Sequence, residues 1–396
     1  MPPSNARRKV ALIRTNFLPY SETFIHDELR HHQRYDATVM ARQHRNADRF
    51  TGHRVVAVES VPAPRQRLAS ALFGLTGYSR LWHRTFQTES FDIVHVHFGH
   101  NALYALPYVE KYDLPLVISL HGRDVSTLHS RDRYYRPEYT LYWQRRLRLF
   151  ARTHLFLAAS DELRDLIVAA GCPPDKVVVH RLGIDLKRFQ PPASPRQNET
   201  PQVLMVGRFV EKKGHIYGFN AAALARAAGC DFALKVVGDG ALMPRYRAEV
   251  SRLGISDAVT FTGPLPHEAV REQLLSSDIM LAPSVVARNG DRDSGLIVAK
   301  EAAACAVPVI GTFHGGIPDI IEDEKTGCLV PERDVDALTD RLKRLLKDAS
   351  LRRQMGTAAR QHMEKNYNIV ERVNALEDIY DHAIAEHRRA RRIPTS

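Results

Sequence analysis

Several features that define other protein classes are scarce or missing in this chain of 396 residues. No run of eighteen apolar residues occurs, so the sequence offers no conventional transmembrane helix. Residues 1–9 are polar and basic, and they lack the apolar stretch and small-residue cleavage site of a secretory signal. We therefore expect a cytoplasmic protein.

Cysteine is also scarce. The four cysteines are far apart in the sequence and lie in apolar surroundings: Cys172, Cys230, Cys305 and Cys328. None of them forms a closely spaced pair of the kind that binds zinc or builds a disulfide framework. We predict four buried, reduced thiols.

Acidic residues are fewer than basic ones, 45 against 56, which gives a net charge of +11. The basic surplus clusters at residues 145–148 and 388–392. Neither cluster is interleaved with aromatic side chains that could stack on bases, so we do not expect a nucleic-acid partner. A solvated helix face is one interpretation of each cluster. An anionic membrane surface is the other, because a basic residue gains about 1 kcal/mol near such a surface.

The chain does contain short apolar runs that alternate with segments of helical apolar spacing. In the first half we predict strands at residues 10–13, 55–58, 93–96, 116–120, 154–158 and 177–180. The segments between them with helical spacing are 21–32, 66–87, 101–111 and 161–170. Such alternation is typical of an α/β protein whose parallel sheet carries helices on both faces.

The alternation stops at a polar, proline-rich segment, residues 190–202, which we interpret as a linker. It then resumes, with predicted strands at residues 203–206, 234–237, 259–262, 279–282, 307–310 and 328–330. The sequence therefore predicts two Rossmann-like, doubly wound domains. A ligand cleft is expected between them, at the carboxyl ends of the strands.

A candidate diphosphate site follows the first strand of the second half. Gly207 permits a tight turn, Arg208 offers a planar fork to phosphate oxygens, and Lys213 offers a compact charge at the start of a helix. Oriented N–H groups at that helix N-terminus favour an anion as well. The alternative is an ordinary strand-to-helix loop with two surface cations.

A second candidate segment contains two acids, Asp293 and Glu301, with a helix predicted to start near Leu296. Asp293 lies in the preceding loop, where its carboxylate could accept hydrogen bonds from hexose hydroxyls. Glu301 lies further along the helix, where it could accept bonds from two ribose hydroxyls. The N–H groups of Gly295, Leu296 and Ile297 would face a pyrophosphate between them. A capping Asp and an unremarkable helix Glu are the alternative reading.

These motifs resemble glycosyltransferase family four over nearly the whole chain. The segments that carry the resemblance are SETFIHDEL from Ser21, HVHFG from His95, LHGRD from Leu120, RLGID from Arg181, VGRFVEKKG from Val206, VVGDG from Val236, FTGPLPHEAV from Phe261, and GLIVAKEAAACAVPVIGTFHGGIPDII from Gly295. SETFI and HGGIP are similar to the subgroup that builds bacterial exopolysaccharides such as colanic acid.

The resemblance implies the GT-B architecture and a retaining enzyme that needs no metal and no other cofactor. It places His121 beside the reactive carbon of the donor sugar, and assigns His121, Asp293 and Glu301 to catalysis. It also implies that the last helix, within residues 371–396, returns to the first domain. We thus expect residues 1–189 to form an acceptor domain and residues 203–370 to form a donor domain.

The sequence departs from the family pattern at two points. Asp293 stands where relatives have a glutamate, which shortens the reach of the carboxylate by roughly 1.5 Å. The first loop, residues 15–23, has no glycine pair. Glu22 and Thr23, at the start of the first predicted helix, are candidates for acceptor contacts or for N-capping.

Two histidines, His95 and His97, alternate along one predicted strand and so point to the same face. With His100 they could suggest a metal site, but no Asp, Glu or Cys nearby in the sequence completes a ligand set. We therefore interpret this face as cleft lining, with His97 as an acceptor contact, and expect no metal.

The resulting prediction is transfer of a hexosyl group from a nucleoside diphosphate sugar to a glycan or polyprenyl-diphosphate-linked acceptor. The expected setting is exopolysaccharide or cell-surface polysaccharide synthesis at the inner face of an anionic membrane. A nucleotide-sugar epimerase on the same fold and a basic nucleic-acid-binding protein are the alternatives. The second predicts steeply salt-dependent binding and leaves the Asp293–Glu301 spacing unexplained.

Overall fold

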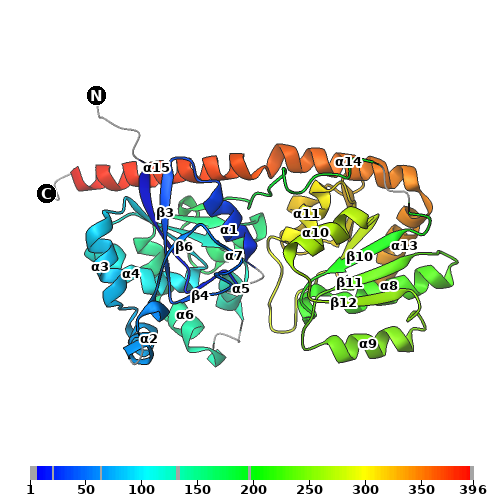
Figure 1. Cartoon of the computed structure of the whole chain (residues 1–396), viewed down its shortest axis with the longest axis horizontal. Helices are drawn as coiled ribbons and strands as arrows, with labels where there is room; N and C mark the ends of the chain where they lie inside the picture. Colours follow the sequence, from blue (N-terminus) through cyan, green and yellow to red (C-terminus); the bar gives the residue numbers. More distant parts are fainter. Residues whose placement is uncertain (1–6, 20–21, 63–64, 131–133, 195–197, 393–396) are drawn as a thin grey trace. The chain divides into compact units, whose positions relative to one another are not determined.

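The computed structural model describes residues 7–19, 22–62, 65–130, 134–194 and 198–392 (Figure 1). It divides the chain into two compact units. The first comprises residues 1–183 together with 369–396, and the second comprises residues 184–368. Within the described residues, no helix is both long and apolar enough to cross a bilayer.

The first unit is built on a parallel sheet in the order β5-β3-β1-β6-β7-β8-β9. Its strands are β1 (Arg8–Ile13), β3 (Tyr35–Ala41), β5 (Arg54–Ala57), β6 (Ile93–His97), β7 (Leu116–Leu120), β8 (Leu155–Ala158) and β9 (Val177–Val179). Two short strands, β2 (Asn16–Phe17) and β4 (Gln43–His44), pair separately. The strand order reverses between β1 and β6, and such a switch point is where open α/β sheets bind ligands.

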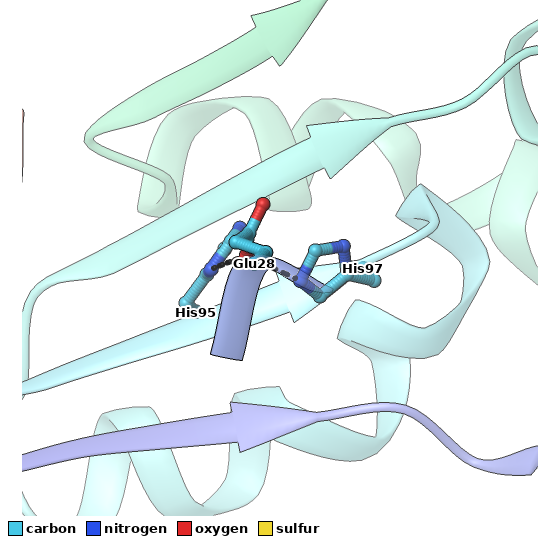
Figure 2. A group of neighbouring side chains, drawn as sticks. All are labelled: Glu28, His95 and His97. Atoms are coloured by element: carbon cyan, nitrogen blue, oxygen red, sulfur yellow. Dashed lines mark ion pairs between the residues drawn. The ribbon is translucent and has the colours of Figure 1, made fainter. Parts of the chain in front are cut away.

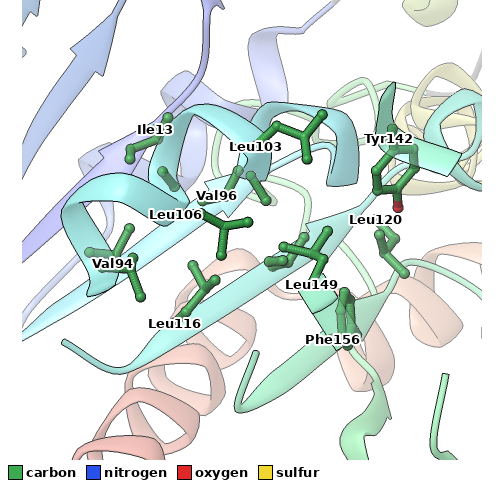
Figure 3. Packing of buried hydrophobic residues seen from close by; sticks show 14 of the residues in the cluster. Ile13, Val94, Val96, Leu103, Leu106, Leu116, Leu120, Tyr142, Leu149 and Phe156 are labelled. Atoms are coloured by element: carbon green, nitrogen blue, oxygen red, sulfur yellow. The ribbon is translucent and has the colours of Figure 1, made fainter. Parts of the chain in front are cut away.

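The helices of the first unit are α1 (Thr23–Arg30), α2 (Arg65–Thr76), α3 (Arg80–Glu89), α4 (Ala102–Lys111), α5 (Arg123–His129), α6 (Pro137–Arg152), α7 (Asp161–Ala169) and α15 (Ile369–Arg392). The core lies between the sheet and the helices that cover it, where Val96, Leu106 and Leu116 interdigitate (Figure 3). Every residue of β6 and β7 is buried, as expected for central strands of a parallel sheet covered on both faces.

The second unit has a six-stranded parallel sheet in the order β12-β11-β10-β13-β14-β15. The strands are β10 (Gln202–Val206), β11 (Ala233–Val237), β12 (Val259–Gly263), β13 (Ile279–Ala282), β14 (Val309–Thr312) and β15 (Gly327–Val330). The helices are α8 (His215–Ala227), α9 (Met243–Arg252), α10 (His267–Ser276), α11 (Ile297–Ala304), α12 (Ile317–Ile320), α13 (Val335–Lys347) and α14 (Ala349–Asn366). Here the order reverses between β10 and β13. The predicted α/β class with two doubly wound sheets is confirmed.

The local predictions differ from the structure in several places, and the short strands β2 and β4 were not predicted. The strand β3 was missed, because its sequence YDATVMA begins with a polar alternation that does not stand out as an apolar run. The segment 66–87, predicted as one helical stretch, forms two helices instead. The chain turns between them at Gly77, whose φ of 73° is accessible to glycine at little cost. All four cysteines are buried and free, as predicted.

The boundary between the units falls earlier than residue 189, where the sequence pattern suggested it. Ile184 forms a parallel bridge with Asn368, and Phe189 is buried in a core of the second unit. Arg360, on α14, also donates a hydrogen bond to the carbonyl of Phe189. These contacts make the segment before the expected linker part of the second unit. Linker residues 195–197 lie outside the described residues.

The last helix, α15, belongs to the first unit. Its apolar residues Leu376 and Tyr380 pack against Val10 and Tyr35, close to where the strands begin. Its Glu377 is fully buried, and the carboxylate accepts hydrogen bonds from the backbone N–H groups of Gln33 and Arg34. These contacts anchor α15 along the amino-terminal edge of the sheet.

Candidate functional site

The loops after β10 and β13 meet at the switch point of the second sheet. Lys213 from the first loop, Ser284 from the second and Leu296 before α11 line one small pocket there. Gly214 lets the loops approach so closely, since it has a φ of 63° and any Cβ would lie 1.8 Å from the carbonyl oxygen of Pro283. The predicted diphosphate loop therefore lies at the position where this fold binds ligands.

An ion pair joins the two predicted donor segments. The Lys213 ammonium lies 3.0 Å from a carboxylate oxygen of Asp293, and both side chains are largely buried. Burial by itself would raise the pKa of Asp293, but the positive charges of Lys213 and Lys212 outweigh it and hold that pKa below its usual range. Burial lowers the pKa of Lys213, and Asp293 opposes that shift. The carboxylate and the ammonium thus keep each other charged.

Asp293 is fixed by neighbours that the sequence pattern did not reveal. The Ser284 hydroxyl donates to its carboxylate at 2.7 Å. Its backbone N–H donates to a ring nitrogen of His314 at 2.9 Å, and the other ring nitrogen of His314 lies 2.7 Å from Glu332. His314 belongs to the HGGIP segment already quoted for the resemblance, but its contact with Asp293 depends on how β14 is placed in the sheet.

The three basic residues of the loop after β10 differ in their surroundings. Lys212 is engaged with Asp291, 3.1 Å away, and with a backbone carbonyl. Lys213 is paired as described above. Arg208 is exposed, and in the part of the chain that the structure describes no acidic side chain lies within 4 Å of it. Arg208 is thus available to an anionic ligand at this loop.

Helix α11 starts at Ile297, one residue after Leu296, in agreement with the predicted start. The N–H groups of a first helical turn have no partner within the helix, so those near Gly295 and Ile297 can serve an anion. Glu301 is buried on the same helix, and its carboxylate lies 2.7 Å from the ring Nε2 of His267. His267 is a second neighbour that the spacing alone did not identify.

The predicted histidine of the first unit, His121, follows β7 directly. Asp124 is fully buried, and its carboxylate accepts hydrogen bonds from the N–H groups of His121, Gly122 and Gly99. Burial raises the pKa of Asp124, while these N–H donors oppose that shift. Burial also lowers the pKa of His121 well below its usual value, which favours the neutral imidazole. These hydrogen bonds fix the turn that carries His121. A side chain that positions a substrate needs such a fixed backbone.

A buried acid lies beside the paired histidines of β6 (Figure 2). Glu28 of α1 places a carboxylate oxygen 3.2 Å from Nε2 of His97 and 3.9 Å from Nδ1 of His95. We argued against a metal because no acid close to these histidines in the sequence completes a ligand set. That ground was wrong, since α1 brings Glu28 next to them in the folded chain. His100 is not in this group and packs edge-on against Tyr139.

The hydrogen bonds of these histidines already account for most ring nitrogens. His95 bonds to the hydroxyls of Ser119 and Tyr380, at 2.8 and 2.6 Å. His97 bonds through Nδ1 to Nε2 of His121, at 2.9 Å. Burial raises the pKa of Glu28, but His97, and to a smaller degree His95, more than offset this and lower it. His97 thus lies between the Glu28 carboxylate, at ion-pair distance, and His121, to which it is hydrogen-bonded.

The candidate acceptor residue Glu22 lies near the end of β1, the second strand of the switch point in the first sheet. Glu22 immediately precedes α1 and forms a two-pronged ion pair with Arg14, at 2.6 and 2.8 Å. Its side chain makes no capping bond to the helix. Thr23 is the first residue of α1 and is partly exposed. The side chain of His97 is fully buried.

Comparisons with known proteins agree with these features. The family description "Glycosyltransferase Family 4" matches residues 21–188, and "Glycosyl transferases group 1" matches residues 187–362. A Salmonella typhimurium protein named as a colanic acid biosynthesis glycosyltransferase, WcaL, is 30% identical over 70% of this chain and 67% of its own. The amylovoran biosynthesis glycosyltransferase AmsK of Erwinia amylovora is 30% identical with the same coverage.

The crystal structure of Anabaena HepE in complex with UDP and glucose superimposes with a TM-score of 0.72. It covers 95% of this chain and all of HepE, at 16% identity. The likeness shows a shared GT-B fold. Together, the two matching families, the relatives and the fold identify the activity class. This chain is a glycosyltransferase and belongs to glycosyltransferase family 4.

Proposed function

We propose that this protein is a retaining transferase that moves a hexosyl group from a nucleoside diphosphate sugar to an acceptor hydroxyl in exopolysaccharide assembly. The observation that carries the proposal is that Lys213 and the residue before α11, Leu296, line one pocket at the switch point, with the exposed Arg208 in the same loop as Lys213. The names of WcaL and AmsK support the exopolysaccharide setting. The UDP and glucose bound to HepE support the donor class. Family membership favours transfer over epimerisation and over nucleic-acid binding.

In this proposal the second unit binds the donor. Arg208 and Lys213 neutralise the diphosphate, and the N–H groups of Gly295, Leu296 and Ile297 add oriented dipoles. Gly207 leaves room for the Lys213 side chain, since a Cβ at this position would lie 3.2 Å from it. Negative charge grows on the departing diphosphate during transfer, so these groups stabilise the transition state more than the ground state.

The three acidic and histidine residues assigned to catalysis have distinct roles. Glu301 accepts hydrogen bonds from the ribose hydroxyls, and His267 keeps its carboxylate in place. Asp293 holds Lys213 and presents its remaining lone pairs to the hexose. His121, as a neutral imidazole, contacts the sugar beside its reactive carbon. The leaving diphosphate itself takes the acceptor proton, which accounts for retention without a covalent intermediate.

The first unit binds the acceptor. The candidate acceptor contacts are Glu22 and Thr23 at the start of α1, with the Glu22 carboxylate held by Arg14. His97, predicted as a third contact, is fully buried and does not reach an acceptor directly. The acceptor is a glycan, and a polyprenyl-diphosphate carrier at an anionic membrane surface suits the basic surface of the chain. The proposed reaction uses no metal ion and no other cofactor.

A thermal-shift screen of UDP, GDP, ADP and their common sugar conjugates tests the donor site. We expect one nucleotide series to raise the melting temperature of the wild type, with a stabilisation of about 2.7 kcal/mol at a hundredfold excess over Kd. Glu301→Ala should remove most of that rise, because it deletes the proposed ribose acceptor. Glu272→Ala, an exposed glutamate of α10, is the matched control and should keep it. A wild type that responds to no nucleotide would refute the proposed donor site.

A further inference from the structure

Helix α2, labelled in Figure 1, carries large apolar side chains that are exposed to solvent. Leu68, Leu72 and Leu75 are 74%, 44% and 86% exposed, and their spacing of four and three residues puts them on one side of the helix. Phe73 points the other way and is buried in the core. Helix α2 therefore has large apolar side chains on its solvent-exposed side as well as on the side that packs against the core. Such a contiguous exposed apolar surface is typical of an interaction site.

The charge around these leucines has one sign. No Asp or Glu occurs between Glu59 and Glu89, while Arg65, Arg67, Arg80 and Arg84 do, and all four are exposed. Among the described residues, no acidic side chain lies within 4 Å of these four arginines. Leucines on an outer helix face flanked by unpaired arginines are the pattern of a helix that lies in the plane of an anionic bilayer surface.

We propose that the outer face of α2, with Leu68, Leu72 and Leu75 at its centre, docks this enzyme onto an anionic lipid surface. A second copy of the chain fits less well, because an isologous pair of these faces would bring the arginines of both copies together. The inference rests on the proposed function in one respect, namely that the acceptor is carried by a membrane lipid.

The position of α2 in the first unit suits this role. Ser70 accepts a hydrogen bond from Arg42, just beyond the carboxyl end of β3, and Phe73 stacks on Tyr104 at the start of α4, just beyond β6. Helix α2 thus lies at the carboxyl edge of the sheet, the edge from which His121 follows β7. A lipid-linked acceptor held at that surface would meet the same edge as the proposed catalytic histidine.

The basic cluster at the end of α15 is placed differently. Arg388 pairs with Asp92 at 3.4 Å and Arg391 with Asp113 at 3.0 Å, both just before strands begin. These arginines therefore lie at the amino edge of the sheet and are already neutralised by acidic partners. We therefore favour α2 over residues 388–392 as the membrane contact.

Vesicle flotation tests the proposal with the full chain. We expect the wild type to float with mixed phosphatidylglycerol–phosphatidylcholine vesicles and not with phosphatidylcholine alone. The triple variant Leu68→Ser/Leu72→Ser/Leu75→Ser should lose about tenfold or more in partitioning, because three leucines no longer enter the interface. Leu224→Ser, which removes a 44% exposed leucine of α8, should partition like the wild type.

Three results would overturn the proposal. The first is that the wild type fails to float with anionic vesicles, and the second is that the triple variant floats as well as the wild type. The third is that the triple variant floats normally while an Arg388→Ala/Arg391→Ala variant no longer floats. The nucleotide-induced thermal shift serves as the separate readout. A shift in the triple variant shows that this variant is folded, whereas the absence of a shift in the wild type counts against the proposed donor site and not against docking by α2.

A different observation carries a second proposal. The carboxylate of Glu28 lies 3.2 Å from the ring of His97 (Figure 2). The other ring nitrogen of His97 lies 2.9 Å from Nε2 of His121. The rings of His97 and His121 are stacked, with an interplanar angle of 9°. The geometry points to Glu28 and His97 as positioning residues that fix the orientation and tautomer of His121, as an acid does for a catalytic histidine elsewhere.

Substitution of Glu28 by Gln tests this arrangement, since the amide keeps the shape but removes the charge. We expect kcat to fall by about tenfold or more with little change in the donor KM. Long-range proton–nitrogen spectra should show one tautomer of His121 in the wild type and a mixture in Glu28→Gln. Glu59→Gln is the control, because Glu59 is an acid of the same unit whose carboxylate accepts a hydrogen bond from the backbone N–H of His44.

An unchanged His121 signal in Glu28→Gln, or a parallel loss of folding without a change of tautomer, would contradict the positioning role. Stoichiometric zinc in the purified protein would also overturn it, because Glu28, His95 and His97 would then be metal ligands. Metal analysis of the wild type and Glu28→Gln decides between the two.

Discussion

Replacing Lys213 with methionine is expected to lower kcat/KM for the donor by about 10²- to 10³-fold, the usual cost of losing one preorganised charge at a leaving group. Methionine keeps most of the volume of the lysine side chain but cannot stabilise the departing diphosphate. The loss should lie mainly in kcat, because the interaction strengthens as the diphosphate leaves. Steady-state kinetics with the nucleotide sugar identified by the thermal-shift screen would measure it.

The ion pair with Asp293 complicates this variant, and the complication can be removed. Lys213→Met leaves the buried Asp293 carboxylate with only Lys212, 3.6 Å away, so the second unit should also lose stability. The double variant Lys213→Met/Asp293→Asn replaces the pair by neutral groups of similar shape. We expect it to regain much of the stability but none of the activity. Recovery of activity in the double variant would contradict a role of Lys213 in leaving-group stabilisation.

Replacing Glu377 with alanine is expected to destabilise the first unit by about 3 kcal/mol, the typical cost of breaking a buried charged contact. The fully buried carboxylate accepts bonds from two backbone N–H groups and from the guanidinium of Arg34, and it also lies 3.1 Å from Nδ1 of His32. Its loss leaves these donors unsatisfied and detaches α15 from the start of β3. Urea unfolding followed by a probe in the first unit would measure the change. Asp378→Ala, an exposed neighbour that contacts the same arginine, should cost less than about 0.5 kcal/mol.

The same carboxylate makes stability depend on pH. Burial raises the pKa of Glu377, but the bond from His32 and the backbone N–H groups outweigh it and lower the pKa from 4.5 to about 2. A group with a lowered pKa in the folded state stabilises that state fully above its unfolded pKa. The contribution should therefore be intact above about pH 4.5 and disappear as the pH falls towards about 2. The wild type and Glu377→Ala should converge in stability over that range, and a constant difference would argue against an ionised carboxylate.

The residues with strong local chemistry were recognisable from the sequence. Gly207, Arg208 and Lys213 stand in a strand-to-helix loop, and a helix does start beside Leu296. These predictions depend on turn chemistry, charge and helical spacing, which act over a few residues. Strand β3 was not predicted, because polar residues at its start interrupt the apolar run, and its pairing with β1 and β5 on either side makes it a strand.

The partners of those residues could not be predicted. Glu28 reaches His97 from α1, His267 reaches Glu301 from α10, and Ser284 and His314 reach Asp293 from loops after two different strands. Each contact joins residues that the strand order brings together at a switch point. Periodicity along the chain carries no information about that order.

Local patterns along the chain thus predicted the class of fold, the two successive βα blocks and the loops that can bind a diphosphate. The tertiary structure alone decided which buried charges are compensated, where α15 is anchored and that the leucines of α2 face outwards. The physical reason is that apolar spacing and turn residues act locally. The burial and charge state of a side chain depend instead on every element packed around it.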